Sequence, residues 1–132
     1  MKKFLEFFKK DKFCAFNGIE LIECKPGRAK AKVTLKPDHL NGADVAHGGL
    51  LFTLADFAFA AAVNAYGNVT LSISNNITYF DKCSEGTIYA EAVEISRSNK
   101  LITCDIPIKH ENGTLLANFK GTAYITKKVI NF

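Results

Sequence analysis

The sequence predicts an α+β fold in which one long helix accompanies an antiparallel sheet. Residues 50–66 form an almost continuous apolar segment, the longest in the chain, and its length suits a buried helix. Residues 28–35 and 101–110 alternate apolar and polar side chains, as half-buried antiparallel strands do. Asn112-Gly113 is a strong β-hairpin signal after the second of these strands.

Composition indicates a single domain over residues 1–132, with 48% hydrophobic and 23% charged residues. No repeat, low-complexity tract or Pro-rich linker suggests a second unit. The net charge of +4 is scattered along the chain, and no aromatic-interleaved basic motif predicts a nucleic-acid partner. A mild basic excess of this kind also suits a ligand that carries phosphate groups.

The four cysteines include no CxxC pair, so we expect no metal site and idle thiols in a reducing, cytoplasmic compartment. The N-terminal MKKFLEFFKKDKF lacks the long apolar run of a signal peptide. Residues 2–13 instead predict a short amphipathic helix that faces the domain with Phe4, Leu5, Phe8 and Phe13. A basic helix of this type can also lie on a membrane surface.

The long helix is expected to begin near Gly48 or Gly49 and to end near Gly67, which suits a left-handed position. Seventeen helical residues reach about 25 Å, which is too short for a membrane span. Its many alanines allow close approach to a sheet or to another helix. Strands are expected at residues 19–24, 28–35, 69–80, 86–96, 101–110 and 114–126.

Asp56 stands in the middle of this apolar helix, just after a His-Gly-Gly turn. Each feature has a simple structural explanation: a hydrogen-bonded buried carboxylate, a capping His47, and glycines that permit a tight turn. Together they indicate chemistry. Unpaired backbone N–H groups at the start of a helix can stabilise an oxyanion, and a poorly solvated carboxylate is a good base. This pair is the minimum needed for acyl transfer or hydrolysis.

Helix geometry then imposes a condition on Gly48 and Asp56. They are eight residues apart, or about 12 Å along one axis, whereas both must lie about 3 Å from one reacting group. Two antiparallel copies, related by a two-fold axis near Phe52, bring the start of one helix beside Asp56 of the other. The sequence therefore predicts an obligate homodimer with two equivalent shared sites.

The residues Asn41, His47-Gly48-Gly49 and Leu54-Ala55-Asp56, followed by SISNNITYF at 72–80 and GTIYAEAVEIS at 86–96, form one combined pattern. In this pattern the chain resembles the hotdog-fold acyl-CoA thioesterases, in the PaaI-like branch that includes relatives of human thioesterase superfamily member 2. The resemblance implies a five- or six-stranded antiparallel sheet wrapped around one long helix. It also implies dimers that pair edge to edge, often as dimers of dimers.

The resemblance assigns catalytic roles by position. Asp56 would activate water as a general base, or attack as a nucleophile to form a mixed anhydride. The Gly48 N–H would polarise the thioester carbonyl, Asn41 would orient the carbonyl or the water, and His47 would steady the turn. Ser72 matches a family serine that helps to place the water.

For substrate binding, the resemblance points to Gly49 in the turn, to Tyr79 along the pantetheine channel, and to Arg97, Asn99 and Lys100 for the phosphates of coenzyme A. Residues 96–100 also suit a simple solvated hairpin loop. Coenzyme A would enter as part of the substrate, with no separate cofactor. Many relatives carry a proline soon after the ITYF segment, whereas this chain has Asp81-Lys82-Cys83.

The leading expectation is hydrolysis of an acyl-CoA to a free acid and coenzyme A. A non-catalytic or slow acyl-CoA sensor is the alternative, and a hydratase of the same fold would need a different placement of its histidine. The acyl group stays open, with Phe52, Phe57, Phe59 and Phe80 as candidates to line its pocket.

Overall fold

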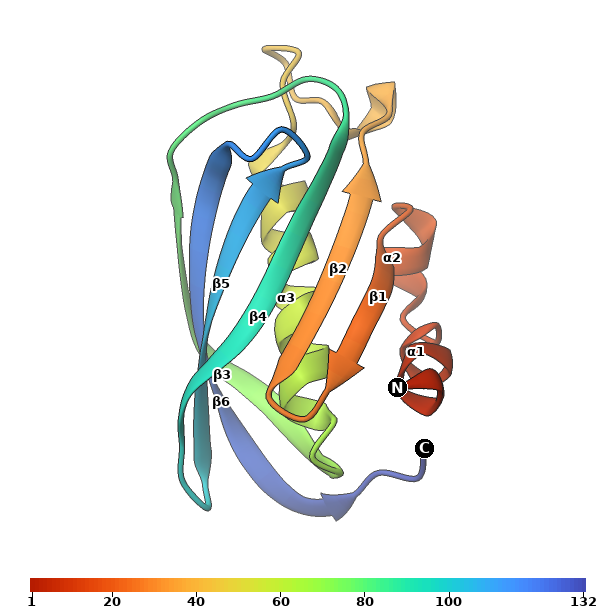
Figure 1. Ribbon diagram of the computed structural model, residues 1–132, viewed down its shortest axis with the longest axis vertical. Helices are drawn as coiled ribbons and strands as arrows, with labels where there is room; N and C mark the ends of the chain where they lie inside the picture. Colours follow the sequence, from red (N-terminus) through yellow and green to blue (C-terminus); the bar gives the residue numbers. More distant parts are fainter.

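In the computed structural model, which describes residues 1–132, a curved six-stranded antiparallel sheet wraps around one central helix (Figure 1). The strands lie in the order β1-β2-β4-β5-β6-β3. In chain order the elements are α1 (Lys2–Phe8), α2 (Lys12–Phe16), β1 (Glu20–Lys25), β2 (Arg28–Thr34), a 3₁₀ turn (Pro37–His39), α3 (Gly48–Asn64), β3 (Asn68–Tyr79), β4 (Thr87–Arg97), β5 (Leu101–His110) and β6 (Leu115–Val129). This arrangement confirms the predicted fold class.

The central helix α3 packs closely because its sheet-facing side chains are small. Ala55, Ala58, Ala61 and Ala62 are fully buried and allow the helix backbone to lie near the sheet. The helix ends at Asn64, slightly before the expected end, and Gly67 follows with a φ of +106°. The left-handed conformation predicted for this glycine is therefore present, just beyond the helix.

The alternating segments form the expected half-buried strands. Their inward side chains are almost completely shielded from solvent: Ala29, Ala31 and Val33 on β2, and Ile102, Cys104, Ile106 and Ile108 on β5. These residues form part of the apolar lining that meets α3 inside the curve of the sheet.

The single N-terminal helix expected over residues 2–13 is wrong. The chain breaks after Phe8, and Asp11 starts a second helix by accepting a hydrogen bond from the Cys14 amide at 2.9 Å. This N-cap changes the helix direction. Phe4 therefore packs inward as expected, whereas Phe13 points outward and is 64% exposed.

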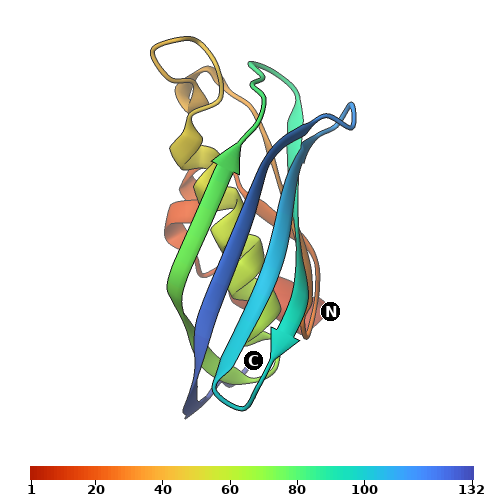
Figure 2. The same cartoon turned by 90° about the vertical axis from the view of Figure 1, so that its left-hand side faces the viewer.

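The two edges of the sheet differ. Edge strand β1 has α1 and α2 beside it (Figure 1), whereas β3 forms a long edge with no neighbour on its outer side (Figure 2). Leu71 and Ile73 on β3 are 55% and 60% exposed. A long edge with exposed apolar side chains is a template for pairing with another strand.

Gly121 on β6 is required by packing. A Cβ built there would lie 2.7 Å from the Phe59 ring, 2.9 Å from Asn75 Oδ1 and 3.0 Å from the Phe119 ring. Gly121 pairs with Asn75 of β3, so its missing side chain makes room both for the core and for the inward amide of Asn75.

We expect Gly121→Ala to lower the free energy of unfolding by about 1–3 kcal/mol, because the added methyl group overpacks this site. Urea unfolding measures the change. Gly42→Ala is the matched control, since a Cβ at Gly42 meets nothing within 4 Å. Equal stability of the two variants would contradict this account of the packing.

Candidate active site

One stripe of α3 is left uncovered by the sheet. The stripe consists of four residues at helical spacing, none of which is fully buried: Gly49, Thr53, Asp56 and Ala60. On one side of the stripe, Thr53 lines a cavity together with Phe13 and Asn17 near α2. On the other side, Phe52 packs edge-on against Phe119 of β6 at a centroid distance of 5.1 Å. Asp56 therefore lies in an open band between α2 and the β6–β3 side of the sheet.

The Asp56 carboxylate accepts no hydrogen bond and forms no ion pair within the chain. Partial burial raises its pKa above the ordinary value, and the negative charge of Asp11 raises the pKa further. A carboxylate without partners, in poor contact with water, keeps its lone pairs available to a proton. The side chain is therefore suited to act as a base.

The N-terminus of α3 leaves one amide without a partner. The Gly49 N–H donates to His47 Nδ1 at 2.8 Å, and the Leu50 and Leu51 N–H groups donate to the His47 carbonyl at 2.9 and 3.3 Å. The Gly48 N–H donates no hydrogen bond. His47 thus caps the helix, and Gly48 alone offers a free donor at the positive end of the helix dipole. Gly49 is exposed, but its amide is already occupied.

Tyr79 and Asn41 surround the free amide of Gly48. These three residues line one cavity of about 210 Å³. The Tyr79 hydroxyl donates to the Gly48 carbonyl at 2.9 Å. Asn41 Oδ1 accepts from the Ala43 and Val45 amides at 2.9 and 3.3 Å, so its oxygen organises the loop while its NH₂ group has no partner within the chain. The structure therefore brings together Asn41, Gly48 and Tyr79.

His39 supports this turn and was missed by the sequence analysis. Its ring is 7% exposed, lies 2.8 Å from the Asn17 carbonyl through Nε2, and accepts from the Lys36 amide at 3.0 Å. Its own carbonyl accepts from the His47 amide at 2.9 Å. His39 thus ties the end of α2 to the cap of α3. No periodicity marks a histidine inside a loop, although its place two residues before Asn41 was a usable hint.

Ser72 lies on β3 and faces the concave side of the sheet, since it pairs with the buried Ala123. Its hydroxyl donates to Asn75 Oδ1 at 2.9 Å. No hydrogen bond joins Ser72 to Asp56 in the single chain. Both Ser72 and Asn75 are exposed, although their partners on β6, Ala123 and Gly121, are buried.

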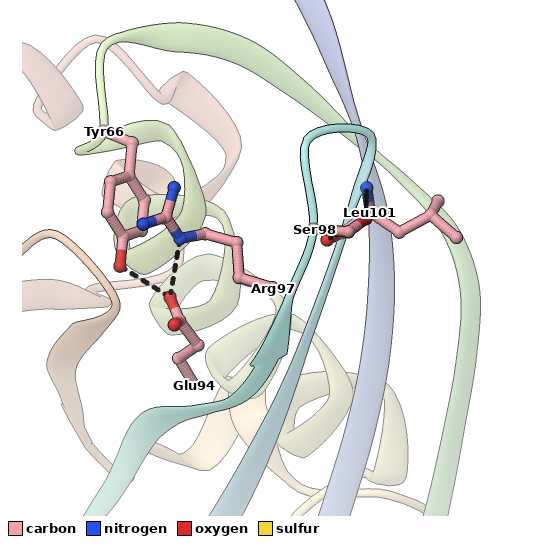
Figure 3. Close-up of polar contacts among 5 residues, drawn as sticks. All are labelled: Tyr66, Glu94, Arg97, Ser98 and Leu101. Carbon is pink, nitrogen blue, oxygen red and sulfur yellow. Dashed lines mark hydrogen bonds and ion pairs between the residues drawn. The ribbon is translucent and has the colours of Figure 1, made fainter.

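Arg97, Asn99 and Lys100 lie at the other end of the sheet from Gly48, at the turn between β4 and β5 (Figures 1 and 2). Figure 3 shows the Arg97 guanidinium over the Tyr66 ring, 4.1 Å from its centroid, and paired with Glu94 at 3.8 Å. Tyr66 also donates to Glu94 at 2.7 Å. One chain therefore does not bring these three basic and polar residues near its own helix start.

Of the phenylalanines considered for an acyl pocket, Phe57 reaches a cavity of about 470 Å³ between α1, α2 and β1. Phe59 is buried in the core, and Phe80 is exposed.

No group of three or more His, Cys, Asp or Glu side chains is placed to hold a metal ion. The cysteines are free thiols, and three of the four are buried. None of the helices combines the length and apolar character that a membrane crossing requires.

Residues 43–117 match the family model of the thioesterase superfamily. The chain belongs to this superfamily. It is 30% identical over 108 residues to the acyl-coenzyme A thioesterase PaaI of Escherichia coli, covering 81% of this chain and 77% of PaaI. It is 41% identical over 118 residues to an Archaeoglobus fulgidus protein whose esterase activity is a provisional assignment, covering 89% and 77% of the two chains.

The solved structure of E. coli PaaI, from the phenylacetic acid degradation operon, superposes with a TM-score of 0.91 over 96% of this chain and 92% of that structure, at 28% identity. The fold is therefore the hotdog fold, and the PaaI-like branch expected from the sequence is confirmed. Asp56 and the free Gly48 amide are the two groups of this thioesterase-superfamily chain that suit its chemistry best.

We expect Asp56→Asn to raise the free energy of unfolding at pH 7 and to change it little at pH 3. The folded state holds the Asp56 proton more tightly than the unfolded state does, because the pKa of the carboxyl is raised on folding. The stability contributed by the carboxyl is thus complete below the unfolded pKa and is lost as the pH rises through the folded pKa. Chemical unfolding at both pH values, with Asp105→Asn on the outer face as control, tests this. A less stable Asp56→Asn protein at pH 7 would refute it.

Proposed function

We propose that the protein is an acyl-CoA thioesterase that releases a free carboxylic acid and coenzyme A, at two sites shared across a homodimer. One observation carries the proposal: α3 has a free amide at Gly48 and an unpaired carboxylate at Asp56, about 12 Å apart along the axis. Membership of the thioesterase superfamily and the similarity to PaaI support the reaction class.

In this mechanism Asp56 accepts a proton from a water molecule, and the water oxygen attacks the thioester carbon. Negative charge develops on the carbonyl oxygen, where the N–H of Gly48 of the partner subunit stabilises it. The tetrahedral intermediate then expels the thiolate of coenzyme A, which takes up the proton held by Asp56. A raised pKa brings Asp56 closer to neutral pH and favours the role of general base. Direct attack by Asp56, through a mixed anhydride, is the competing route.

Two features support the homodimer. Strand β3 presents an open edge, and the neighbouring stripe of α3 is not covered by its own sheet. Antiparallel pairing of two β3 edges would continue the sheet across both chains and set the two stripes against each other. Gly48 of the partner subunit would then face Asp56. Further pairing of dimers into a tetramer is part of the same proposal.

The same two-fold symmetry would bring together two regions that lie at opposite ends of one chain: the helix start at Gly48 and the β4–β5 turn proposed to bind coenzyme A. A two-fold axis across α3 inverts the partner, so its β4–β5 turn lies at the same end as Gly48 of the first chain. Arg97, Asn99 and Lys100 would approach the phosphates from this turn, while Asn41 and Tyr79 contact the pantetheine end. Arg97 must give up part of its contact with Glu94 to do so.

A sensor that binds acyl-CoA without turnover is the second candidate. The unpaired state of both the Gly48 amide and the partly buried Asp56 carboxylate favours the enzyme, because a binding protein has no need of a desolvated carboxylate. Release of coenzyme A from a panel of acyl-CoAs, followed with a thiol reagent, separates the two functions.

We expect Asp56→Asn to reduce turnover by about 10²–10⁴-fold, because it removes the base and keeps the shape. Steady-state release of coenzyme A measures the effect, and Asp105→Asn serves as the control that loses a carboxylate elsewhere. Unchanged turnover in Asp56→Asn would remove this residue from the mechanism.

The Gly48 donor can be deleted selectively with proline. Gly48 is the first residue of α3, where proline is favoured, and His47 has φ −63° and ψ 134°, which suit a residue before proline. Gly48→Pro should lower turnover by about 10²–10³-fold. Gly48→Ala is the control, since it crowds Tyr79 in the same way and keeps the N–H.

Mixing the two inactive variants tests the shared site. In a heterodimer of Asp56→Asn and Gly48→Pro chains, one site keeps both functional groups. Random reassociation should therefore restore about a quarter of the wild-type activity. A mixture that stays inactive while heterodimers form would contradict sites composed of two chains.

A further inference from the structure

Ser72 and Asn75 form a polar pair in an unusual place. Both side chains point to the concave face of β3, because Ser72 pairs with the buried Ala123 and Asn75 pairs with Gly121. Concave positions on the neighbouring strands are apolar and buried. These two are exposed to solvent in the single chain. Gly121, the partner of Asn75, lies against Phe59 of α3, so the pair is on the side of the sheet that faces the central helix.

Two structural features place this pair on the concave face. The pairing of β3 with β6 shifts between Ser72 and Ser74, and the extra residue of this β-bulge turns Asn75 inward together with Ser72. Without the bulge, strict alternation would direct Asn75 to the outer face. Gly121 then leaves room for the amide, since its missing Cβ would lie within 3 Å of both Asn75 Oδ1 and the Phe59 ring. Phe59 is about one helical turn from Asp56.

The hydrogen bond within the pair has a direction. The Ser72 hydroxyl donates to Asn75 Oδ1 at 2.9 Å, and a hydroxyl has one hydrogen to give. With that hydrogen committed, Ser72 Oγ can act only as an acceptor. The NH₂ group of Asn75 has no acceptor within the chain.

We propose that Asn75 is a positioning residue that orients the Ser72 hydroxyl for the attacking water. Ser72 Oγ accepts one hydrogen of the water, Asp56 takes the other, and the water oxygen keeps a lone pair for the thioester carbon. This inference rests on the proposed hydrolysis. It adds a residue, Asn75, whose side chain acts only through Ser72.

The strand supplies matched controls for every variant. Asn76 and Ser74 are chemically identical neighbours that pair with Lys120 and Thr122 on the outer face. The experiment compares Asn75→Ala, Ser72→Ala and the double variant with Asn76→Ala and Ser74→Ala. Asn75→Asp is the conservative variant, because its carboxylate still accepts from Ser72. Each protein is assayed for kcat and KM with one acyl-CoA and for its oligomeric state by gel filtration.

We expect Asn75→Ala and Ser72→Ala each to lower kcat roughly tenfold with little change in KM, as the loss of one well-placed hydrogen bond does. The double variant should match Ser72→Ala alone, because the two residues act as one unit. Asn75→Asp should restore most of kcat, and the two outer-face controls should keep it.

Three results would overturn the role of Asn75: an unchanged kcat in Asn75→Ala, effects that multiply in the double variant, or activity lost together with the dimer. Wild-type protein that releases no coenzyme A from any acyl-CoA would overturn the proposed function and this role with it. If the wild type is active and Asn75→Ala has the same kcat, the role of Asn75 is overturned and the proposed function stands.

Discussion

The fixed rise of an α-helix, about 1.5 Å per residue, governs the whole arrangement. It keeps Gly48 and Asp56 about two turns apart, so a single chain presents a donor and a base that cannot act on one carbonyl. The proposed two-fold symmetry would remove this separation, because an antiparallel copy would place its helix start opposite the middle of the first helix. The chemistry proposed for this protein depends on that relation.

The two sides of the sheet differ in how far they are covered. Small alanines let α3 sit deep in the curve, while α1 and α2 lie along the β1 edge. On the opposite side, β3 keeps an open edge with exposed Leu71 and Ile73. Asp56 is partly buried and has no hydrogen-bonding partner, and burial raises the pKa of its carboxyl, a state that costs stability and favours proton transfer. Fold and site thus share one open face.

Side-chain direction decides which residues can take part in the candidate site. The His-Gly-Gly turn and Asp56 were found from sequence because their residue types and spacing carry the chemistry. His39 and Asn75 were not found, since a loop histidine has no periodic signal and a β-bulge reverses the face that alternation predicts. The free state of the Gly48 amide, too, required an account of every hydrogen bond around His47.

By itself, the sequence determined the six strands, the approximate length of the central helix and the residue types able to act on a thioester. Those features depend on local periodicity, turn residues and chemical identity, which a linear pattern contains. Only the tertiary structure decided that Phe13 is exposed, that Arg97 lies far from its own Gly48, and that β3 has an open edge. Such outcomes depend on which segments pack together in space, and strand order and burial are properties of the whole fold.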